Sequence, residues 1–252
     1  MGAGTLSQPD GGKREVCIGG NVSSDRQDRG FVIAATGLLA EARIAARSGS
    51  VRAVASGGSA TRLAELIEDA IEGGAQAIAS FGIAGGLSED LKPGTCVIGS
   101  EVIYAGAIYR ADAAWTARLG RRLCAATLDR IAGVDEVLSH PTRKRALNAA
   151  TGAAAVDMES HIVAALALRH KLPFAVVRVI ADWVERRVPQ AALVGMRSDG
   201  ATDVGACLRS LARDPSQAPA LVGIAVDTAR AMLQLFRSVQ LMGPGFGFFD
   251  RG

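Results

Sequence analysis

The chain has few of the residues that build nucleic-acid-binding surfaces or disulfide frameworks. Only 4% of its 252 residues are aromatic, and its net charge at pH 7 is +3. The basic residues are spread along the chain without clustering beside aromatic side chains, which argues against a nucleic acid as partner. Cys17, Cys96, Cys124 and Cys207 show no paired spacing, which is typical of reduced thiols in a cytoplasmic protein.

Metal sites and membrane spans have equally little support. No second histidine or cysteine lies at metal-ligand spacing from any histidine, so no metal is expected, and we expect His161 and His170 on an exposed helix face. No run approaches the roughly 18 uncharged apolar residues that a membrane-spanning helix needs. Residues 1–29 are polar and glycine-rich and lack the apolar core of a secretory signal, so we expect a disordered N-terminal extension there.

What the chain does contain is a regular alternation of predicted strands and helices. Three strand-then-helix or strand-then-turn steps begin at Phe31, Val51 and Ala75, and a long apolar helix ends at Gly243. Between them, 96–107 reads as extended and 111–131 as helical. This alternation predicts the α/β class, as a single-domain three-layer α/β/α sandwich over residues 30–242 with a mixed, mostly parallel sheet. Residues 243–252, which include GFGFF, are expected to form a flexible tail.

Two carboxylates stand at the exits of two predicted buried strands, in the stretch AAAVDMESHIVAALALRHKLPFAVVRVIAD at 153–182. The apolar run before Asp157 breaks into an acidic turn that carries Glu159, and a helix follows. The β-rich run from Phe174 to Ile180 leads to Asp182. In open α/β sheets this edge is where ligands bind, so the two acids are candidates to grip one ligand together.

Two glycine-rich turns also follow predicted strands. In SGGSATR, the free N–H groups of Gly58 and Ser59 suit a phosphate, and Arg62 is placed to reinforce them. In SFGIAGG, Gly82 lets a ligand approach the backbone closely. Tight packing explains either turn equally well. The chain lacks GxGxxG, GxSxG and GxxxxGK[ST], which argues against a dinucleotide site, a serine hydrolase elbow and a P-loop.

Four strings, TGLLAEA, SFGIAGGLSEDLKPG, AAAVDMES and PFAVVRVIAD, resemble in their order and spacing the purine nucleoside phosphorylase and methylthioadenosine nucleosidase superfamily. The resemblance covers roughly residues 31–189, and the order of four motifs makes it more specific than any one of them. A closer resemblance is to the hopanoid-associated phosphorylases of bacteria, through VDMESH and VPQAALVGMRSDGATDVGACLRSLARDP. It implies a nucleoside phosphorylase fold, a homo-oligomer, no cofactor, and release of adenine from adenosylhopane in hopanoid biosynthesis.

The family pattern, carried over to this chain, implies a role for each candidate residue. Glu159 is expected to accept hydrogen bonds from the ribose hydroxyls, and Met158 to lie against the sugar. Asp182 is expected to help protonate the leaving base, and Glu41 matches the acid that activates water in the hydrolytic members. The remaining candidates are Ser80, Gly82 and Val137 for the substrate and Gly58, Ser59 and Arg62 for a phosphate.

The nucleophile is not decided by these motifs. The arginine-rich phosphate cradle of true phosphorylases is not evident, and Ala181 stands where many relatives have serine, yet the closer resemblance favours phosphorolysis with inorganic phosphate as co-substrate. Hydrolysis by a methylthioadenosine or S-adenosylhomocysteine type of nucleosidase, or a purine nucleoside phosphorylase of salvage, are the alternatives. A lipid-linked substrate would account for the GFGFF tail through peripheral membrane contact.

Structural readings compete with these roles. Glu159 also suits the start of a helix, where a negative charge is favoured, and Arg178, inside an apolar strand, is expected to form a buried structural pair. A non-catalytic nucleoside-binding protein is the rival from another class. A nicotinamide oxidoreductase is suggested by fold class alone, and the missing GxGxxG argues against it.

Overall fold

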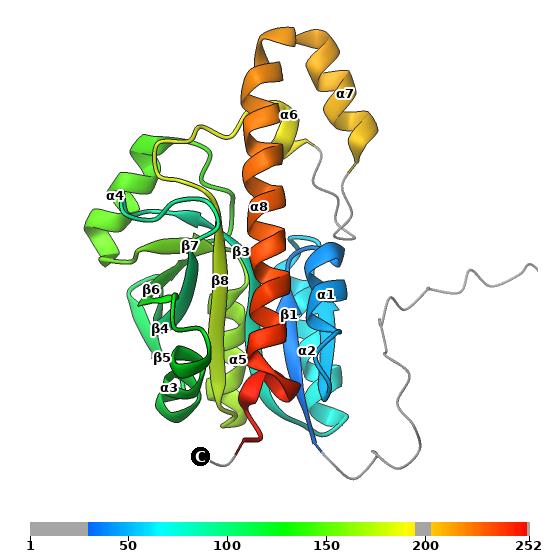
Figure 1. Cartoon of the computed structure of the whole chain (residues 1–252), viewed down its shortest axis with the longest axis vertical. Coiled ribbons are helices and arrows are strands. Elements are labelled where there is room, and N and C mark those ends of the chain that lie inside the picture. Colours follow the sequence, from blue (N-terminus) through cyan, green and yellow to red (C-terminus); the bar gives the residue numbers. More distant parts are fainter. Residues whose placement is uncertain (1–29, 195–202, 251–252) are drawn as a thin grey trace, which may run out of the picture.

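In the computed structural model, which describes residues 30–194 and 203–250, eight strands form one mixed sheet with helices on both faces (Figure 1). The strands are β1 (Phe31–Thr36), β2 (Val51–Ala55), β3 (Ala75–Gly86), β4 (Cys96–Tyr104), β5 (Ala107–Arg110), β6 (Thr127–Gly133), β7 (Ala155–Asp157) and β8 (Phe174–Asp182). The helices are α1 (Leu39–Ala45), α2 (Ala60–Glu72), α3 (Ala113–Arg122), α4 (Pro141–Thr151), α5 (Ser160–His170), α6 (Gln190–Leu193), α7 (Val204–Arg213) and α8 (Ala218–Met242), with short 3-10 turns η2 (Pro215–Gln217) and η3 (Pro244–Gly247). The predicted α/β class is confirmed.

Parallel pairing brings the carboxyl ends of four strands to one edge of the sheet. β1 lies between β2 and β3, and β3 pairs with β8, all in parallel. These strands therefore deliver the residues that follow them to the same edge, as the position of Asp182 at the end of β8 implied.

The sheet also curls until its far strands meet. β8 pairs antiparallel with β4, β4 pairs with β6, β6 with β7, and β7 returns to the end of β3. The closing contact joins Gly85 and Gly86 of β3 to Val156 and Ala155 of β7. As a result, the acidic turn after β7 lies directly beside the ends of β3 and β8.

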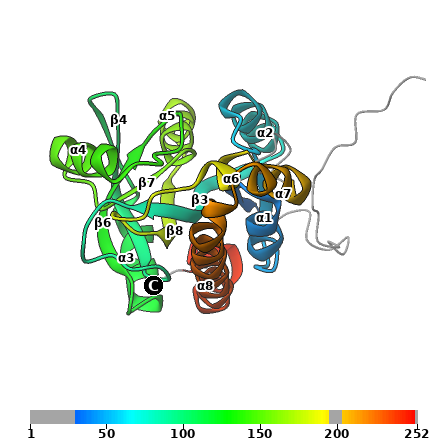
Figure 2. The same cartoon turned by 90° about the horizontal axis from the view of Figure 1, so that it is seen from above.

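Two apolar layers hold the helices on the sheet. α1, α3 and α8 cover one face through residues that include Trp115 and Leu235, both 0% exposed. α2 and α5 cover the other face through Leu63, Ile67 and Val163. Figure 2 shows α2 and α5 on one side of the sheet and α1 and α8 on the other. Since aromatics are scarce, both layers are built mainly of alanine, valine, leucine and isoleucine.

The segment 111–131, expected to be helical throughout, is helical only to Arg122. From Thr127 it forms β6, which pairs with β4 on one side and β7 on the other. The prediction was wrong there because sheet pairing between distant segments overrides a local apolar spacing that also suits a helix.

The C-terminal segment differs from the flexible tail that was expected. Phe246 is 1% exposed and its ring centroid lies 5.2 Å from that of Phe81, while Trp115 Nε1 donates a 2.9 Å hydrogen bond to the Phe246 carbonyl. Gly243 and Gly245 take positive φ angles of 73° and 56°, which allow the tight turn. The phenylalanines thus close one end of the core. The predicted N-terminal extension at 1–29 lies outside the described residues.

One helical stretch, Pro215–Met242, is long and apolar enough by length and composition to cross a membrane, with a mean hydropathy of 1.2 in its most apolar window. Its C-terminal part packs on the sheet instead, where Leu235, Val239 and Met242 are buried. Its N-terminal part extends beyond the sheet together with α6 and α7 (Figure 1).

Candidate active site

A cavity of about 590 Å³ lies at the edge of the sheet where the parallel strands end. The segments after β1 and β2 line it, together with the end of β3, the turn between β7 and α5, and the end of β8. One wall is the apolar face of α8. A volume of several hundred Å³ with a few convergent polar groups is typical of a small-molecule site.

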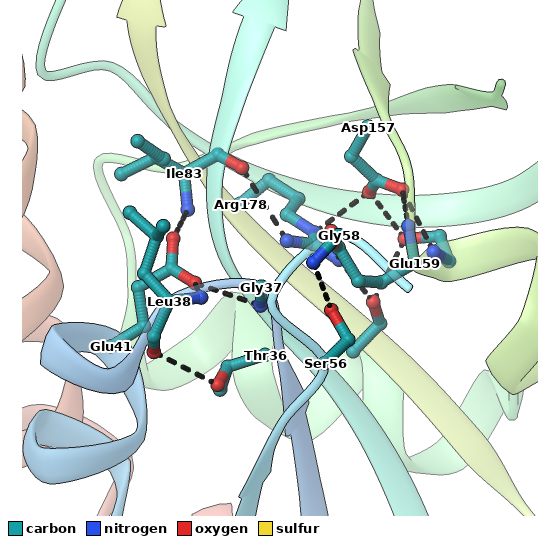
Figure 3. A network of polar contacts seen from close by, with 12 residues as sticks. Thr36, Gly37, Leu38, Glu41, Ser56, Gly58, Ile83, Asp157, Glu159 and Arg178 are labelled. Carbon is teal, nitrogen blue, oxygen red and sulfur yellow. Dashed lines mark hydrogen bonds and ion pairs between the residues drawn. The ribbon is translucent and has the colours of Figure 1, made fainter. Parts of the chain in front are cut away.

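At the polar end of the cavity, three carboxylates surround one buried guanidinium (Figure 3). Arg178 of β8 is 0% exposed, with Nε 2.7 Å from Asp157 Oδ2 and Nη2 3.3 Å from Glu159 Oε2. Glu41 contributes a further favourable interaction with this guanidinium. Because an unpaired charge is costly inside a protein, the buried guanidinium needs carboxylate partners, and Asp157 and Glu159 supply them. The predicted buried pair of Arg178 is confirmed, and it lies under the candidate site.

Glu41 is held by the backbone of two different segments. Its Oε2 accepts hydrogen bonds from the N–H groups of Gly37 at 2.9 Å and Leu38 at 2.8 Å, and its Oε1 accepts one from Ile83 at 2.8 Å. The side chain lines the cavity although the residue is only 1% exposed. Burial raises the pKa of Glu41, and the Arg178 charge and these hydrogen bonds oppose that rise. A carboxylate offers about four acceptor positions, so three hydrogen bonds leave one for a ligand or a water.

Glu159 lies at the start of α5 and faces Glu41 across a glycine. A Cβ at Gly37 would stand 2.7 Å from Glu159 Oε1 and 3.6 Å from Glu41 Oε2. Burial raises the pKa of Glu159 to about 7, and the neighbouring charges of Asp157 and Glu41 add to the rise while Arg178 opposes it. No side-chain hydrogen bond from Glu159 caps the helix, so the capping role is not what its carboxylate performs.

Asp182 forms a second polar corner of the cavity, where it is paired with a buried lysine. Lys144 of α4, 1% exposed, forms an ion pair with Asp182 Oδ2. Its ammonium also donates to the Trp183 carbonyl at 3.0 Å and the Arg186 carbonyl at 3.4 Å. Burial raises the pKa of Asp182, and Lys144 opposes the rise. Both side chains line the cavity.

The far end of the cavity is apolar. It is lined by Val188, Ala192, Leu193, Cys207, Leu221, Ile224, Ala225, Thr228 and Ala229. These residues come from α6, α7, α8 and the segment before α6, and none carries a charge. The cavity therefore joins a charged end at the sheet to an uncharged end between helices.

The structure separates the sequence-predicted residues into two groups. Glu41, Gly58, Val137, Met158, Glu159 and Asp182 line the cavity. Ser80, Gly82, Ser59 and Arg62 do not.

Ser80 and Gly82 support the site from beneath. Ser80 is 0% exposed, and its Oγ accepts a hydrogen bond from Arg178 and lies 2.9 Å from Ser160 Oγ. A Cβ at Gly82 would stand 2.7 Å from Glu41 Oε1 and 2.8 Å from Arg178 Nη1, so the glycine makes room for the charged cluster. The expected direct contact of these two residues with a substrate is therefore not supported.

The proposed phosphate turn reaches the cavity only in part. Ser59 caps α2, its Oγ accepting a 3.3 Å hydrogen bond from the Arg62 N–H, and neither residue lines the cavity. The side chains of Ser59 and Arg62 therefore do not form the phosphate site that was expected from them. Gly57 and Gly58 alone contribute to the wall.

Two features escaped the sequence reasoning. Lys144 sits among other basic residues in PTRKRAL, and only the helix position shows that it alone of them is buried. His161 was expected on an exposed face, but it is 6% exposed, and its ring stacks on Tyr104 with centroids 4.2 Å apart. That expectation was wrong because α5 is buried on more than one side, which removes the amphipathic spacing that marks an exposed face.

A family model described as "Phosphorylase superfamily" matches residues 20–213, which is most of the chain. No curated protein matches.

Solved structures with the same fold include a futalosine hydrolase of Helicobacter pylori, with a TM-score of 0.64, 13% identity, and coverage of 84% of this chain and 96% of that one. A mutant 5′-methylthioadenosine nucleosidase of the same organism, with 5′-methylthioadenosine in its active site, has a TM-score of 0.60 and 14% identity, and the match covers 84% of this chain and 99% of that one. The nucleosidase of Streptococcus pneumoniae in complex with 8-aminoadenine has a TM-score of 0.57 and 15% identity, and the match covers 83% of this chain and 99% of that one. At such low identity these likenesses establish the fold alone.

Proposed function

Because this chain belongs to the phosphorylase superfamily, we propose that it is an enzyme that cleaves the N-glycosidic bond of a nucleoside. The observation that carries the proposal is one cavity that presents Glu159 and Asp182 at two separate corners, with Arg178 buried beneath the first. Two carboxylates so placed can hold a sugar and its base at the same time.

The charges of the cavity suit the transition state of this reaction. As the bond between C1′ and the base nitrogen breaks, its electron pair goes to the base and positive charge builds on the sugar ring. Glu159 accepts hydrogen bonds from the ribose hydroxyls and stabilises that positive charge. Asp182 gives a proton to the leaving base, which a buried and therefore less acidic carboxyl group is suited to do.

Water is the nucleophile that the geometry favours. Glu41, Asp157, Glu159 and Asp182 line the cavity, and Lys144, already paired with Asp182, is the one cation in its wall among the described residues. A phosphate dianion entering this wall would meet like charge. Glu41 has an acceptor position left, and burial makes its carboxylate more basic, so it can take a proton from a water that attacks C1′. The arrangement thus supports hydrolysis better than the phosphorolysis expected from the sequence.

The uncharged end of the cavity favours an apolar 5′ substituent on the ribose. Leu193, Leu221 and Ile224 would contact such a group, whereas a 5′-phosphate would find no cation there among the described residues. We propose an adenosyl compound with an apolar 5′ group. 5′-Methylthioadenosine, which a structural neighbour binds, and adenosylhopane, which the sequence resemblance suggests, both satisfy this requirement.

A lipid-linked substrate would bring the enzyme to a membrane surface. The helices that form the apolar end of the cavity carry exposed apolar side chains, among them Leu208 of α7 and Val222 and Val226 of α8. Their position beside the cavity supports a peripheral contact there.

The test is to incubate the purified protein with adenosine, 5′-methylthioadenosine, adenosylhopane and inosine, each with and without inorganic phosphate, and to measure free base. We expect adenine and free ribose products without phosphate, faster for apolar 5′ substituents. Phosphate-dependent formation of a ribose 1-phosphate would refute hydrolysis. Binding of nucleosides without turnover, unchanged by Asp182→Asn, would instead identify a non-catalytic nucleoside-binding protein.

A further inference from the structure

Lys144 is a buried charge at the cavity to which the proposed reaction gives no role. It lies on α4, in a run of basic residues whose neighbours Arg143 and Arg145 are exposed and pair with Glu136 and Glu185. Lys144 alone points inward and is 1% exposed. Burying an ammonium is costly, so its partners must matter to the structure or to the reaction.

The ammonium group has no donor left for a substrate. Its three N–H bonds face Asp182 Oδ2, the Trp183 carbonyl and the Arg186 carbonyl. An ammonium has three donors and no acceptor, so these three contacts use it completely. Lys144 can therefore affect a ligand only through the groups that it binds, which are the Asp182 carboxylate and the two carbonyls.

The ion pair between Lys144 and Asp182 Oδ2 leaves Oδ1 of Asp182 for the ligand. Oδ2 is paired with Lys144, while Oδ1 has no hydrogen-bond partner among the described residues and lies close to Gly85, where an added Cβ would stand 3.3 Å away. Gly85 and Asp182 both line the cavity. The same lysine ties down the two carbonyls of the turn that follows β8, so the carboxyl group and its main chain are fixed together.

We propose that Lys144 is a positioning residue for Asp182, holding Oδ2 and the following turn so that Oδ1 faces the leaving base and the carboxylate formed after proton transfer is stabilised. This role rests on the proposed function. In the step, the C1′–N bond breaks, its electron pair goes to the base, the proton on Oδ1 moves to the base, and the new negative charge on Asp182 lies against the Lys144 ammonium. An attacking water, whose proton goes to Glu41, forms the new bond to C1′, as in the proposed function.

The charges around Asp182 make this effect measurable by pH. Lys144 from α4 and Arg186 from the turn after β8 lower the pKa of Asp182, whereas burial and Asp227 of α8 raise it. Removing the lysine charge raises this pKa further, so Asp182 keeps its proton to higher pH but releases it less readily. The basic limb of the kcat profile then moves to higher pH while its plateau falls.

The experiment compares two substrates in wild type, Lys144→Met, Lys144→Arg and Asp182→Asn. 5′-Methylthioadenosine needs its base protonated, whereas 4-nitrophenyl riboside has a leaving group that departs as an anion. We expect Lys144→Met to lower kcat for the nucleoside about 10²-fold, with KM little changed, and to leave the nitrophenyl riboside nearly unaffected. Lys144→Arg should recover part of the loss, and adding Lys144→Met to Asp182→Asn should cost nothing more, because the two residues act as a unit.

The control is Arg145→Met on the same helix, which removes an exposed ion pair to Glu185 in the same turn and should change neither substrate. If Lys144→Met does not fold, Lys144→Gln, which keeps a donor without the charge, takes its place. Equal effects on both substrates, or additivity with Asp182→Asn, would overturn this role while leaving the proposed function intact. A wild-type protein that releases a base from none of the nucleosides tested, adenosylhopane included, would refute the proposed function and this role with it.

Discussion

The pKa of about 7 for Glu159 predicts a specific acid limb in the activity of this protein. Only the ionised carboxylate accepts hydrogen bonds through both oxygens and stabilises positive charge on the ribose ring. At pH 5 roughly 1% of a group with this pKa is ionised, and at pH 8 roughly 90% is. We therefore expect kcat/KM to rise about a hundredfold between pH 5 and pH 8, with a midpoint near 7 rather than near the ordinary glutamate value.

The assay is kcat/KM for 5′-methylthioadenosine at constant ionic strength from pH 5 to pH 9, in wild type and Glu159→Gln. The variant should lose about 10²- to 10³-fold at pH 8, and its residual activity should lack the limb near pH 7. Glu185→Gln is the control, because Glu185 is a more exposed carboxylate in the turn after β8. A limb that persists unchanged in Glu159→Gln would assign the titration to another group and refute the reasoning.

The raised pKa of Glu159 also makes the free energy of unfolding depend on pH, and proton linkage fixes the direction of that dependence. The pKa of Glu159 is raised in the folded state from its ordinary value of 4.5 to about 7, so the folded protein binds more protons between these values. Stability therefore falls as pH rises through this window, by about 3 kcal/mol for this group alone. Glu159→Gln should flatten the fall in urea denaturation measured at pH 5 and pH 8; an equal fall in both proteins would contradict this.

Two further predictions concern packing around the site and at the C-terminus. Gly82→Ala places a methyl group against Glu41 and Arg178, so it should displace both side chains and lower kcat/KM at least tenfold. Gly120→Ala is the control, because its methyl group meets nothing within 4 Å and should leave kcat/KM unchanged. Equal kinetics of the two variants would contradict the close approach at Gly82. Phe246→Ala should lower the free energy of unfolding by about 3–5 kcal/mol in urea denaturation, whereas Phe249→Ala, at a side chain 37% exposed, should cost clearly less; equal costs would show that the C-terminal segment does not close the core.

Much of the fold was accessible from local sequence patterns. The strands at Phe31 and Val51, the helix that follows Ser59, and the long last helix all begin and end close to where apolar spacing and glycines placed them. Spacing works there because each segment has one period that buries one face. The segment 111–131 was misassigned because its spacing suits both a helix and a strand, and pairing with β4 decided between them.

Local patterns predicted the part of the candidate site that follows strand ends, whereas Glu41, Met158 and Val137 came from the family resemblance. Asp182 follows β8, whose parallel pairing with β3 places its end at the edge where ligands bind. Glu159 follows β7, which runs antiparallel to β3, and it reaches the same place only because the sheet curls. Ser80 and Gly82 lie within β3, and whether they line the cavity or support it depends on the curl of the sheet. Lys144 carries no local signal at all, because its exposed neighbours are also basic.

The sequence by itself determined the α/β class, the order of most elements and the two acids at strand exits, because these depend on periodicity and on chain direction. Only the tertiary structure decided the electrostatics of the site. The pairing of Asp182 with Lys144, the clustering of three carboxylates around Arg178, and the burial of Phe246 join residues far apart along the chain. The charge of a buried group depends on what the fold brings within a few ångströms of it, and no local pattern specifies those neighbours.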